Sequence, residues 1–232
     1  MHFYTKDGGQ KYPISPGDIW QAGPHVIACN DLYYGKSLDT ALQISGAPYA
    51  VYVDPPWGSG VEKSYRTKAG LPIESFVNYP DLITKIYTRI RTVPGPIAVE
   101  CGRLQVDLFR ACAHFVGMEE TATVPIVYGA GSRPAVLLGY HGADLRDCAG
   151  MDDQNTPLIF LSGLLPSRNT IVFDPCTGRG ATAIAADEAN LTFVGGELVP
   201  TRMSVTLRKL ADRGHVPILV NQQIAPRAVS TG

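Results

Sequence analysis

The stretch from Thr170 to Glu197 constrains the fold of this chain most strongly. An apolar run after Thr170 predicts a buried strand, Gly178 and Gly180 form the turn that follows, and a helical segment comes next. This order directs backbone N–H groups and the positive end of the helix dipole at one point, which favours a nucleotide or another anion. A second apolar run ends in Glu197. An acid there, about 20 residues after the glycines, is typical of sites that hold ribose hydroxyl groups.

A second informative sequence, Asp54-Pro55-Pro56-Trp57, follows the apolar run at residues 50–53. Proline has no N–H and a fixed φ, so this strand end is stiff and carries open carbonyl groups. The Asp54 carboxylate and a prolyl carbonyl can accept hydrogen bonds from one amino group. Trp57 can stack on the ring that carries the amine, which is worth about 1–3 kcal/mol. Taken alone, however, the sequence is more typical of a rigid turn.

The hydrophobic pattern predicts strands and helices in alternation along the chain. Strands are expected at 25–29, 49–53, 97–101, 119–128, 135–140, 170–173, 191–196 and 216–220. Helices are expected at 37–44, 79–91, 103–116, 158–165, 183–188 and 201–213. This alternation predicts an α/β fold whose mostly parallel, twisted sheet carries helices on both faces. The strands at 119–128 and 135–140 should form an antiparallel hairpin at one end of the sheet.

The ends of the chain and one internal stretch lack these periods. Residues 1–16 are expected to form an N-terminal arm, residues 17–222 a single domain, and residues 223–232 a polar tail. The stretch at 58–70 combines glycines with Lys63, Tyr65, Arg66 and Lys68. It predicts a flexible loop. This loop either closes on nucleic acid, with the cations on phosphates and the tyrosine on a base, or is an ordinary solvated loop.

Composition limits the classes of function. The formal net charge of −1 provides no general basic field, so any contact with nucleic acid must come from local patches or a partner. The five cysteines are not spaced like zinc ligands and lie mostly in apolar surroundings, which predicts reduced intracellular thiols, no metal and no disulfide. The chain shows no signal segment and no apolar stretch of membrane length, so we expect a cytoplasmic protein without membrane association.

Asp54-Pro55-Pro56-Trp57 and the segment 174–182 resemble two motifs of the amino-methyltransferases of nucleic acids. These are the catalytic motif and the S-adenosylmethionine motif of enzymes that methylate adenine at N6 or cytosine at N4. The catalytic motif comes first here, which resembles the circularly permuted β class of DNA methyltransferases. The segment 17–31 also resembles the leader of that class, in which a Gly-Asp pair usually stands at Asn30 and Asp31.

The resemblance implies a Rossmann-like methyltransferase fold, S-adenosyl-L-methionine as cofactor, and methylation of the N6 amine of adenine in DNA. The target base would be flipped out of the helix and stacked on Trp57. Asp54 and the Pro55 carbonyl would accept hydrogen bonds from its amine, and so free the nitrogen lone pair for attack on the methyl group. The implied catalytic residues are Asp54, Pro55, Pro56 and Trp57. The implied cofactor-binding residues are Asp31 at the adenine, Glu197 at the ribose, Asp174, Gly178 and Gly180 at the methionine part, and Cys176, Thr182 and Leu198.

The chain departs from the family pattern at several cofactor positions. Cys176 and Arg179 stand where the family usually has Phe and Ser, Thr156 stands where Lys is usual, and Asn30 stands where Gly is usual. Residues 58–173 are almost fully assigned to the sheet and its helices, which leaves no sizeable target-recognition insert. Recognition would then come from residues 58–78, residues 142–155, a second copy of the chain or another protein.

Three alternatives stay open. The target could be adenine in RNA, because compact domains with Trp after Asp-Pro-Pro also occur among RNA adenine methyltransferases. It could be the N4 amine of cytosine, although that class usually has Ser where Asp54 stands. The chain could also be a non-catalytic subunit of a modification complex that keeps the fold.

Overall fold

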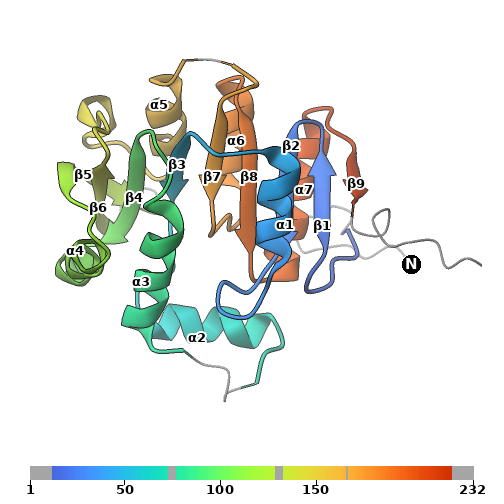
Figure 1. Ribbon diagram of the computed structural model, residues 1–232, viewed down its shortest axis with the longest axis horizontal. Coiled ribbons are helices and arrows are strands. Elements are labelled where there is room, and N and C mark those ends of the chain that lie inside the picture. Colours follow the sequence, from blue (N-terminus) through green and yellow to red (C-terminus); the bar gives the residue numbers. More distant parts are fainter. Residues whose placement is uncertain (1–11, 73–76, 129–132, 166, 221–232) are drawn as a thin grey trace, which may run out of the picture.

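The computed structural model describes residues 12–72, 77–128, 133–165 and 167–220. Most of the predicted N-terminal arm and all of the predicted polar tail lie outside these residues. Within them, the strands form one sheet in the order β5-β6-β4-β3-β7-β8-β2-β1-β9 (Figure 1). The strands are β1 (Ile19–Ala22), β2 (His25–Cys29), β3 (Ala50–Val53), β4 (Ile97–Gly102), β5 (Glu120–Tyr128), β6 (Arg133–Tyr140), β7 (Ile171–Asp174), β8 (Thr192–Glu197) and β9 (Pro217–Leu219).

The five central strands are parallel, and antiparallel strands flank them at each edge. The predicted hairpin is confirmed, because β5 pairs with β6 and β6 pairs with β4 in antiparallel register. A second antiparallel pair, β1 with β9, lies at the other edge. The neighbours β3 and β7 continue into helices on opposite faces of the sheet. Ligands bind at such a switch point, outside the carboxyl ends of the strands.

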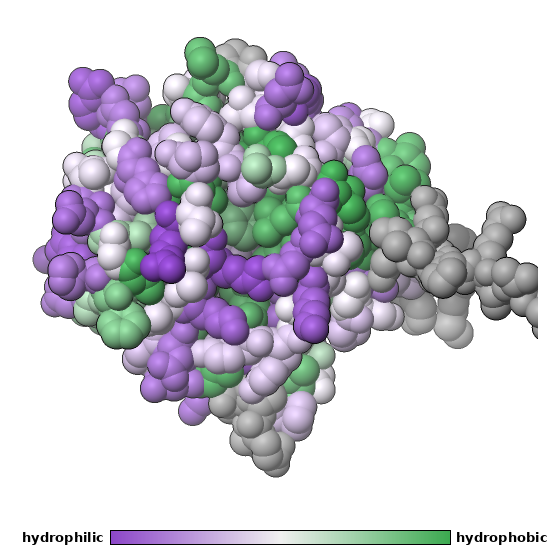
Figure 2. Space-filling model, viewed as in Figure 1, coloured by the Kyte–Doolittle hydropathy of each residue, from purple (hydrophilic) through white to green (hydrophobic). Residues whose placement is uncertain are grey.

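Helices cover both faces of the sheet, as predicted (Figure 1). One face carries α1 (Ser37–Ser45), α3 (Tyr79–Ile90) and α4 (Val106–Phe115). The other carries α5 (Thr156–Ser162), α6 (Ala181–Glu188) and α7 (Pro200–Asp212). On the face shown in Figure 2, hydrophilic and hydrophobic side chains are interspersed, since the helices turn their apolar sides toward the sheet.

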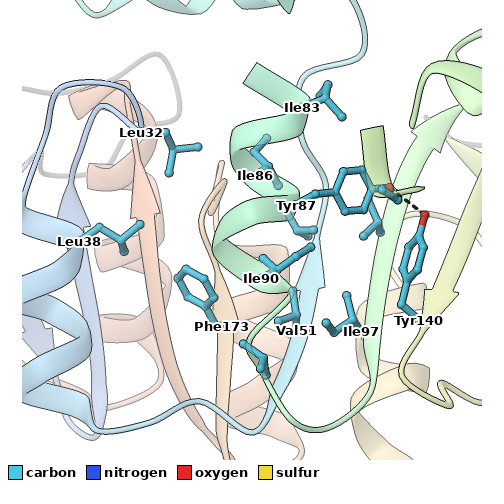
Figure 3. Packing of buried hydrophobic residues seen from close by; sticks show 14 of the residues in the cluster. Leu32, Leu38, Val51, Ile83, Ile86, Tyr87, Ile90, Ile97, Tyr140 and Phe173 are labelled. Atoms are coloured by element: carbon cyan, nitrogen blue, oxygen red, sulfur yellow. Dashed lines mark hydrogen bonds between the residues drawn. The ribbon is translucent and has the colours of Figure 1, made fainter. Parts of the chain in front are cut away.

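The core has two halves because side chains of a strand alternate between the faces of a sheet. Val51 of β3 packs with the first group of helices, whereas its neighbour Tyr52 packs with the second. Figure 3 shows the first half, where Ile86 and Tyr87 of α3 lie against the strands. The hydroxyl groups of Tyr87 and Tyr140 are hydrogen-bonded at 3.0 Å. The helical period predicted for 79–91 therefore corresponds to a buried face.

The prediction of a flexible loop at 58–70 is wrong, because residues Ser59–Lys68 form helix α2. The buried side of this helix consists of the ion pair between Glu62 and Arg66, which are 3% and 2% exposed. A search for apolar side chains at helical spacing cannot detect such a helix. In Figure 1, α2 crosses below the carboxyl ends of the central strands, where it covers the switch point.

The opposite end of the sheet carries a cluster of charged groups around Asp187 at the end of α6. The Phe193 N–H donates to His25 Nδ1, so the proton of this ring is on Nε2, which lies 3.2 Å from Asp187. The same carboxylate accepts hydrogen bonds from Arg168, Arg213 and His215. Although the three residues His25, Asp187 and His215 have the side chains of a metal site, the two arginines already neutralise the carboxylate. The cluster therefore joins β2, α6, β8 and the segment before β9.

No helix in the described ranges combines the length and the apolar character needed to cross a membrane.

Candidate active site

A cavity of about 300 Å³ lies at the carboxyl ends of the parallel strands. The strand ends of β2, β3, β7 and β8 form its floor, and α2 covers it. The predicted residues that line it are Asp31, Asp54, Pro55, Pro56, Trp57, Tyr65, Arg66, Cys176, Glu197 and Leu198. The two motifs that are far apart in the sequence thus meet in one cavity.

The strand β3 delivers Asp54 and the two prolines to this cavity. The Pro56 carbonyl accepts a hydrogen bond of 2.8 Å from the Tyr79 hydroxyl of α3, which fixes the turn. The Pro55 carbonyl, by contrast, has no hydrogen-bond donor within the described part of the chain. Asp54 and Pro55, which the sequence predicts to accept hydrogen bonds from an amino group, therefore both lie at the cavity wall.

Gly102 leaves room beside the Trp57 ring. A Cβ atom at Gly102 would approach the ring to 3.0 Å, which is tighter than an ordinary contact. The centroid of the Tyr128 ring is 4.5 Å from that of Trp57, at an interplanar angle of 57°. Both aromatic residues line the cavity, so a planar ligand entering beside Asp54 meets an aromatic wall.

The glycine turn after β7 takes the conformation that its sequence predicts. Gly178 and Gly180 have φ of 61° and 85°, which favour glycine. A Cβ atom at Gly180 would also lie 2.6 Å from the side chain of Thr206 on α7. Behind this turn, Asp174 is buried and accepts a hydrogen bond of 2.8 Å from the Cys176 N–H. The turn is thereby fixed in a tight loop at the start of α6, on which Thr182 is buried.

Glu197 and Asp31 occupy the predicted positions at strand ends, and both carboxylates already have protein partners. Glu197 accepts hydrogen bonds of 2.7 Å from the N–H groups of Gly178 and Val199. Asp31 accepts from both terminal nitrogens of Arg66, at 2.9 and 3.3 Å, and from the Tyr33 N–H. The segment that follows β2 is therefore linked to α2 through one bidentate ion pair.

The four residues predicted to bind nucleic acid have different environments. Lys63 and Lys68 are exposed on α2, and Tyr65 lines the cavity. Arg66 is buried and paired with Asp31 and Glu62, so it does not present its charge to a phosphate. The prediction that Arg66 contacts the nucleic-acid backbone is therefore wrong for this structure. Burial of two charges requires mutual pairing, which explains why this arginine faces inward.

Burial changes the charge state of the acids at the strand ends. It raises the pKa of Asp54 to about 7, although the Arg202 guanidinium limits the rise. Burial also raises the pKa of Asp174 to about 7 and moves the pKa of Glu197 above its ordinary value. Beside Asp54, the buried Glu100 accepts a hydrogen bond from Tyr52, and burial raises its pKa strongly. Such shifts at a cleft are typical of functional carboxylates.

Sequence reasoning assigned no role to several residues of the cavity wall, among them Tyr128, Arg202 and Asn30. Tyr128 ends a predicted strand and Arg202 lies at the start of a predicted helix, but neither belongs to a motif. Asn30 lines the cavity with its Oδ1 fixed by Ser37 and Leu38 and its Nδ2 buried without a partner in the described residues. The sequence did contain a signal for Asn30, namely its position next to Asp31 at the end of a predicted strand. The resemblance, however, noted residue 30 only as a departure from the family pattern.

The fold is that of the Rossmann-like methyltransferases. The structure is similar to that of M1.HpyAVI, with a TM-score of 0.56, 15% identity, and coverage of 79% of this chain and 97% of that chain. It is also similar to a putative DNA modification methylase from Thermus thermophilus, with a TM-score of 0.55, 15% identity, and coverage of 81% and 95%. The PvuII DNA methyltransferase, which is cytosine-N4-specific, has a TM-score of 0.55, 11% identity, and coverage of 83% and 92%. No protein-family model matches the chain, and no curated protein matches it.

Proposed function

We propose that this protein is an S-adenosylmethionine-dependent DNA methyltransferase that methylates the N6 amine of adenine. The observation that carries the proposal is the meeting of two acceptors, Asp54 and the Pro55 carbonyl, with Pro175 and Cys176 of the second motif and with Glu197 in one cavity. One half of this cavity suits a planar amine, and the other suits an adenosine carrier. Residues 17–222 would form one methyltransferase domain of a cytoplasmic protein.

The residues present fit the cofactor. Asp31 after β2 and Glu197 at the end of β8 can accept hydrogen bonds from an adenine amine and from ribose hydroxyl groups. Gly178 and Gly180 have no side chains that would keep a ligand away from the backbone. Two solved structures with this fold, M1.HpyAVI and the Thermus thermophilus protein, are complexes with this cofactor. We assign the cofactor-binding roles to Asp31, Asp174, Cys176, Gly178, Gly180, Thr182, Glu197 and Leu198.

The pairing of Asp31 with Arg66 adds a condition to this assignment. Asp31 can reach an adenine amine only with the oxygen lone pairs that Arg66 and Tyr33 leave open, or after α2 moves. A carboxylate carries about four lone-pair positions, of which three are used here. Asp31 can therefore bind one further donor without losing its existing partners.

The chain contributes positioning to the reaction. When bound, the cofactor supplies a methyl group that its sulfonium charge already activates. Asp54 and Pro55 would hold the amine, and the ionised Asp54 would draw the amine hydrogens out of the plane of the base, which would free the nitrogen lone pair for attack. Trp57 holds the ring by stacking, and Pro56 fixes the turn through Tyr79. Positioning of this kind supplies a large part of an enzymatic rate enhancement.

The choice of adenine rests on Asp54 and Trp57, because the fold is shared by a cytosine-N4 enzyme. Adenine in RNA and the N4 amine of cytosine are the alternative substrates, and a non-catalytic subunit is the alternative role. Lys63 and Lys68 on α2 and Arg133 at the cavity mouth are exposed cations that suit a phosphate backbone. Sequence recognition would be supplied by a second copy of the chain or by a partner subunit.

An assay with labelled S-adenosylmethionine tests the proposal. The protein is incubated with duplex DNA, single-stranded DNA or RNA, and the methylated nucleoside is identified after digestion. We expect N6-methyladenine in DNA. If the product is N4-methylcytosine or a methylated RNA nucleoside, the proposed substrate is wrong. If no methyl group is transferred to any of the three nucleic acids, the proposed enzymatic activity is wrong.

Methyl transfer should depend on pH through Asp54. Only the ionised Asp54 carboxylate carries the negative charge that strengthens its hydrogen bond from the amine, and burial raises the pKa of Asp54 to about 7. Activity should therefore be high above pH 7 and should fall about tenfold per pH unit below it. The pH profile of kcat/KM checks this, with circular dichroism at each pH to confirm that the protein stays folded. A profile that is flat down to pH 5 would contradict the assignment.

A further inference from the structure

Arg202 is a charged residue of the cavity to which no motif assigns a role. It lies in the first turn of α7, shortly after Glu197, and its side chain is 27% exposed. Its Nε is buried and has no hydrogen-bond partner in the described part of the chain. A buried donor without a partner is costly, so its presence in a cavity wall indicates a missing ligand group.

Two neighbours hold the guanidinium in place without neutralising it fully. Its Cζ atom lies 4.4 Å from the centre of the Tyr65 ring of α2, which is a cation–π contact. Its Nε is 3.8 Å from Glu197 Oε2, which is too long for a hydrogen bond. The same oxygen already accepts the Gly178 N–H at 2.7 Å. The guanidinium is therefore oriented by the ring and retains the capacity to bind an anion.

The other cations of the described cavity wall are placed differently. Arg66 is paired with Asp31 and Glu62, and Arg133 is exposed at the mouth. Arg202 instead packs against the Tyr65 ring of α2, and its charge acts on both Glu197 and Asp54. Because Arg202 lines the cavity, an acidic group at the end of a small ligand bound there can reach it.

The geometry points to Arg202 as the residue that binds the carboxylate at the amino-acid end of the cofactor, an inference that rests on the proposed function. The bound cofactor carries two cationic groups, its sulfonium and its ammonium, and one anionic group. The cavity wall carries the carboxylates of Asp31, Asp54, Glu62 and Glu197, and the Nε of Arg202 has no hydrogen-bond partner among the described residues. A planar guanidinium binds a carboxylate through two parallel hydrogen bonds, which a lysine cannot reproduce.

Two ligands that differ in the amino-acid end test this inference. S-adenosylhomocysteine contains the carboxylate, whereas 5′-methylthioadenosine contains the same adenosine and sulfur without it. Binding of both is measured by calorimetry for the wild type and for Arg202→Gln, Arg202→Lys and Arg208→Gln. Arg208 is an arginine on the same helix, outside the cavity wall, and serves as the matched control. Thermal unfolding of each variant confirms that it is folded.

We expect Arg202→Gln to weaken S-adenosylhomocysteine about 10-fold to 100-fold, since hydrogen bonds to charged groups contribute about 1.5–3 kcal/mol. Arg202→Lys should weaken it less, and 5′-methylthioadenosine should bind all variants equally. Equal weakening of both ligands, or of neither, would overturn the inference. If Arg202→Gln loses DNA binding but keeps its affinity for S-adenosylhomocysteine, the inference is also overturned, because Arg202 then binds a phosphate of the nucleic acid. If the wild type binds neither ligand, the proposed function itself fails.

Discussion

Replacing Asp54 with asparagine is expected to slow methyl transfer about 10³-fold and to leave cofactor binding intact. Asparagine has almost the same shape, but it has no negative charge and turns an NH₂ group toward the target amine. One of the two acceptors of the proposed site is then lost, and a donor faces a donor. Single-turnover rates with labelled S-adenosylmethionine measure the effect, and calorimetry with S-adenosylhomocysteine shows whether the cofactor half is preserved.

Asp107→Asn is a suitable control for this variant, because Asp107 is exposed on α4 and lies outside the cavity wall. Its rate should equal that of the wild type. If Asp54→Asn retains the wild-type rate, Asp54 does not hold the amine and the catalytic role proposed for it is wrong.

Replacing Asp187 with asparagine is expected to destabilise the protein by about 3 kcal/mol, a typical value when one partner of a buried ion pair is removed. The carboxylate is 7% exposed and accepts hydrogen bonds from two arginines and two histidines. Asparagine leaves Arg168 without a counter-charge among the described residues and leaves Arg213 with Glu188 alone. Urea unfolding measures the change. Glu188→Gln is the control, since Glu188 is 38% exposed and pairs only with Arg213 among the described residues, so it should change stability by less than about 1 kcal/mol.

The effect of Asp187 on stability has a definite pH dependence. The hydrogen bonds from its partners outweigh its burial and hold the pKa of Asp187 well below its ordinary value. A depressed pKa contributes stability above the unfolded-state value of about 4 and loses it as the pH falls further. The difference between wild type and Asp187→Asn should therefore be constant near neutral pH and shrink below about pH 4. A difference that grows in acid would contradict this account.

The convergence of the site could be predicted from the sequence because its signals are local. Asp54, Asp174 and Glu197 each follow an apolar run, and parallel strands present their carboxyl ends at one edge of a sheet. The glycines at 178 and 180 indicate a turn that only small residues allow, and the structure has positive φ at both. The antiparallel hairpin was likewise predictable from two β-rich runs around a glycine turn.

What the sequence did not reveal depends on partners far along the chain. Helix α2 was missed because its buried side is charged, and Arg66 faces inward only because Asp31 of a distant strand end completes its pairing. By its sequence, Arg202 belongs to a basic helix face, since nothing local distinguishes an arginine that faces a cavity from one that faces water. Pairing between distant charges has no periodic signature, so these residues became apparent only in three dimensions.

Both margins of the sheet are poorly suited to strand addition. On the outer side of β5, the carbonyl groups of Pro125 and Val127 already accept hydrogen bonds from Gly150 and Asp153, and Pro125 has no N–H to offer. The opposite margin, β9, is a three-residue strand that begins with proline. Interrupted margins of this kind prevent one sheet from extending into another, which is a common route to aggregation. A second copy or a partner subunit would therefore dock more readily through helices and loops than by extending the sheet.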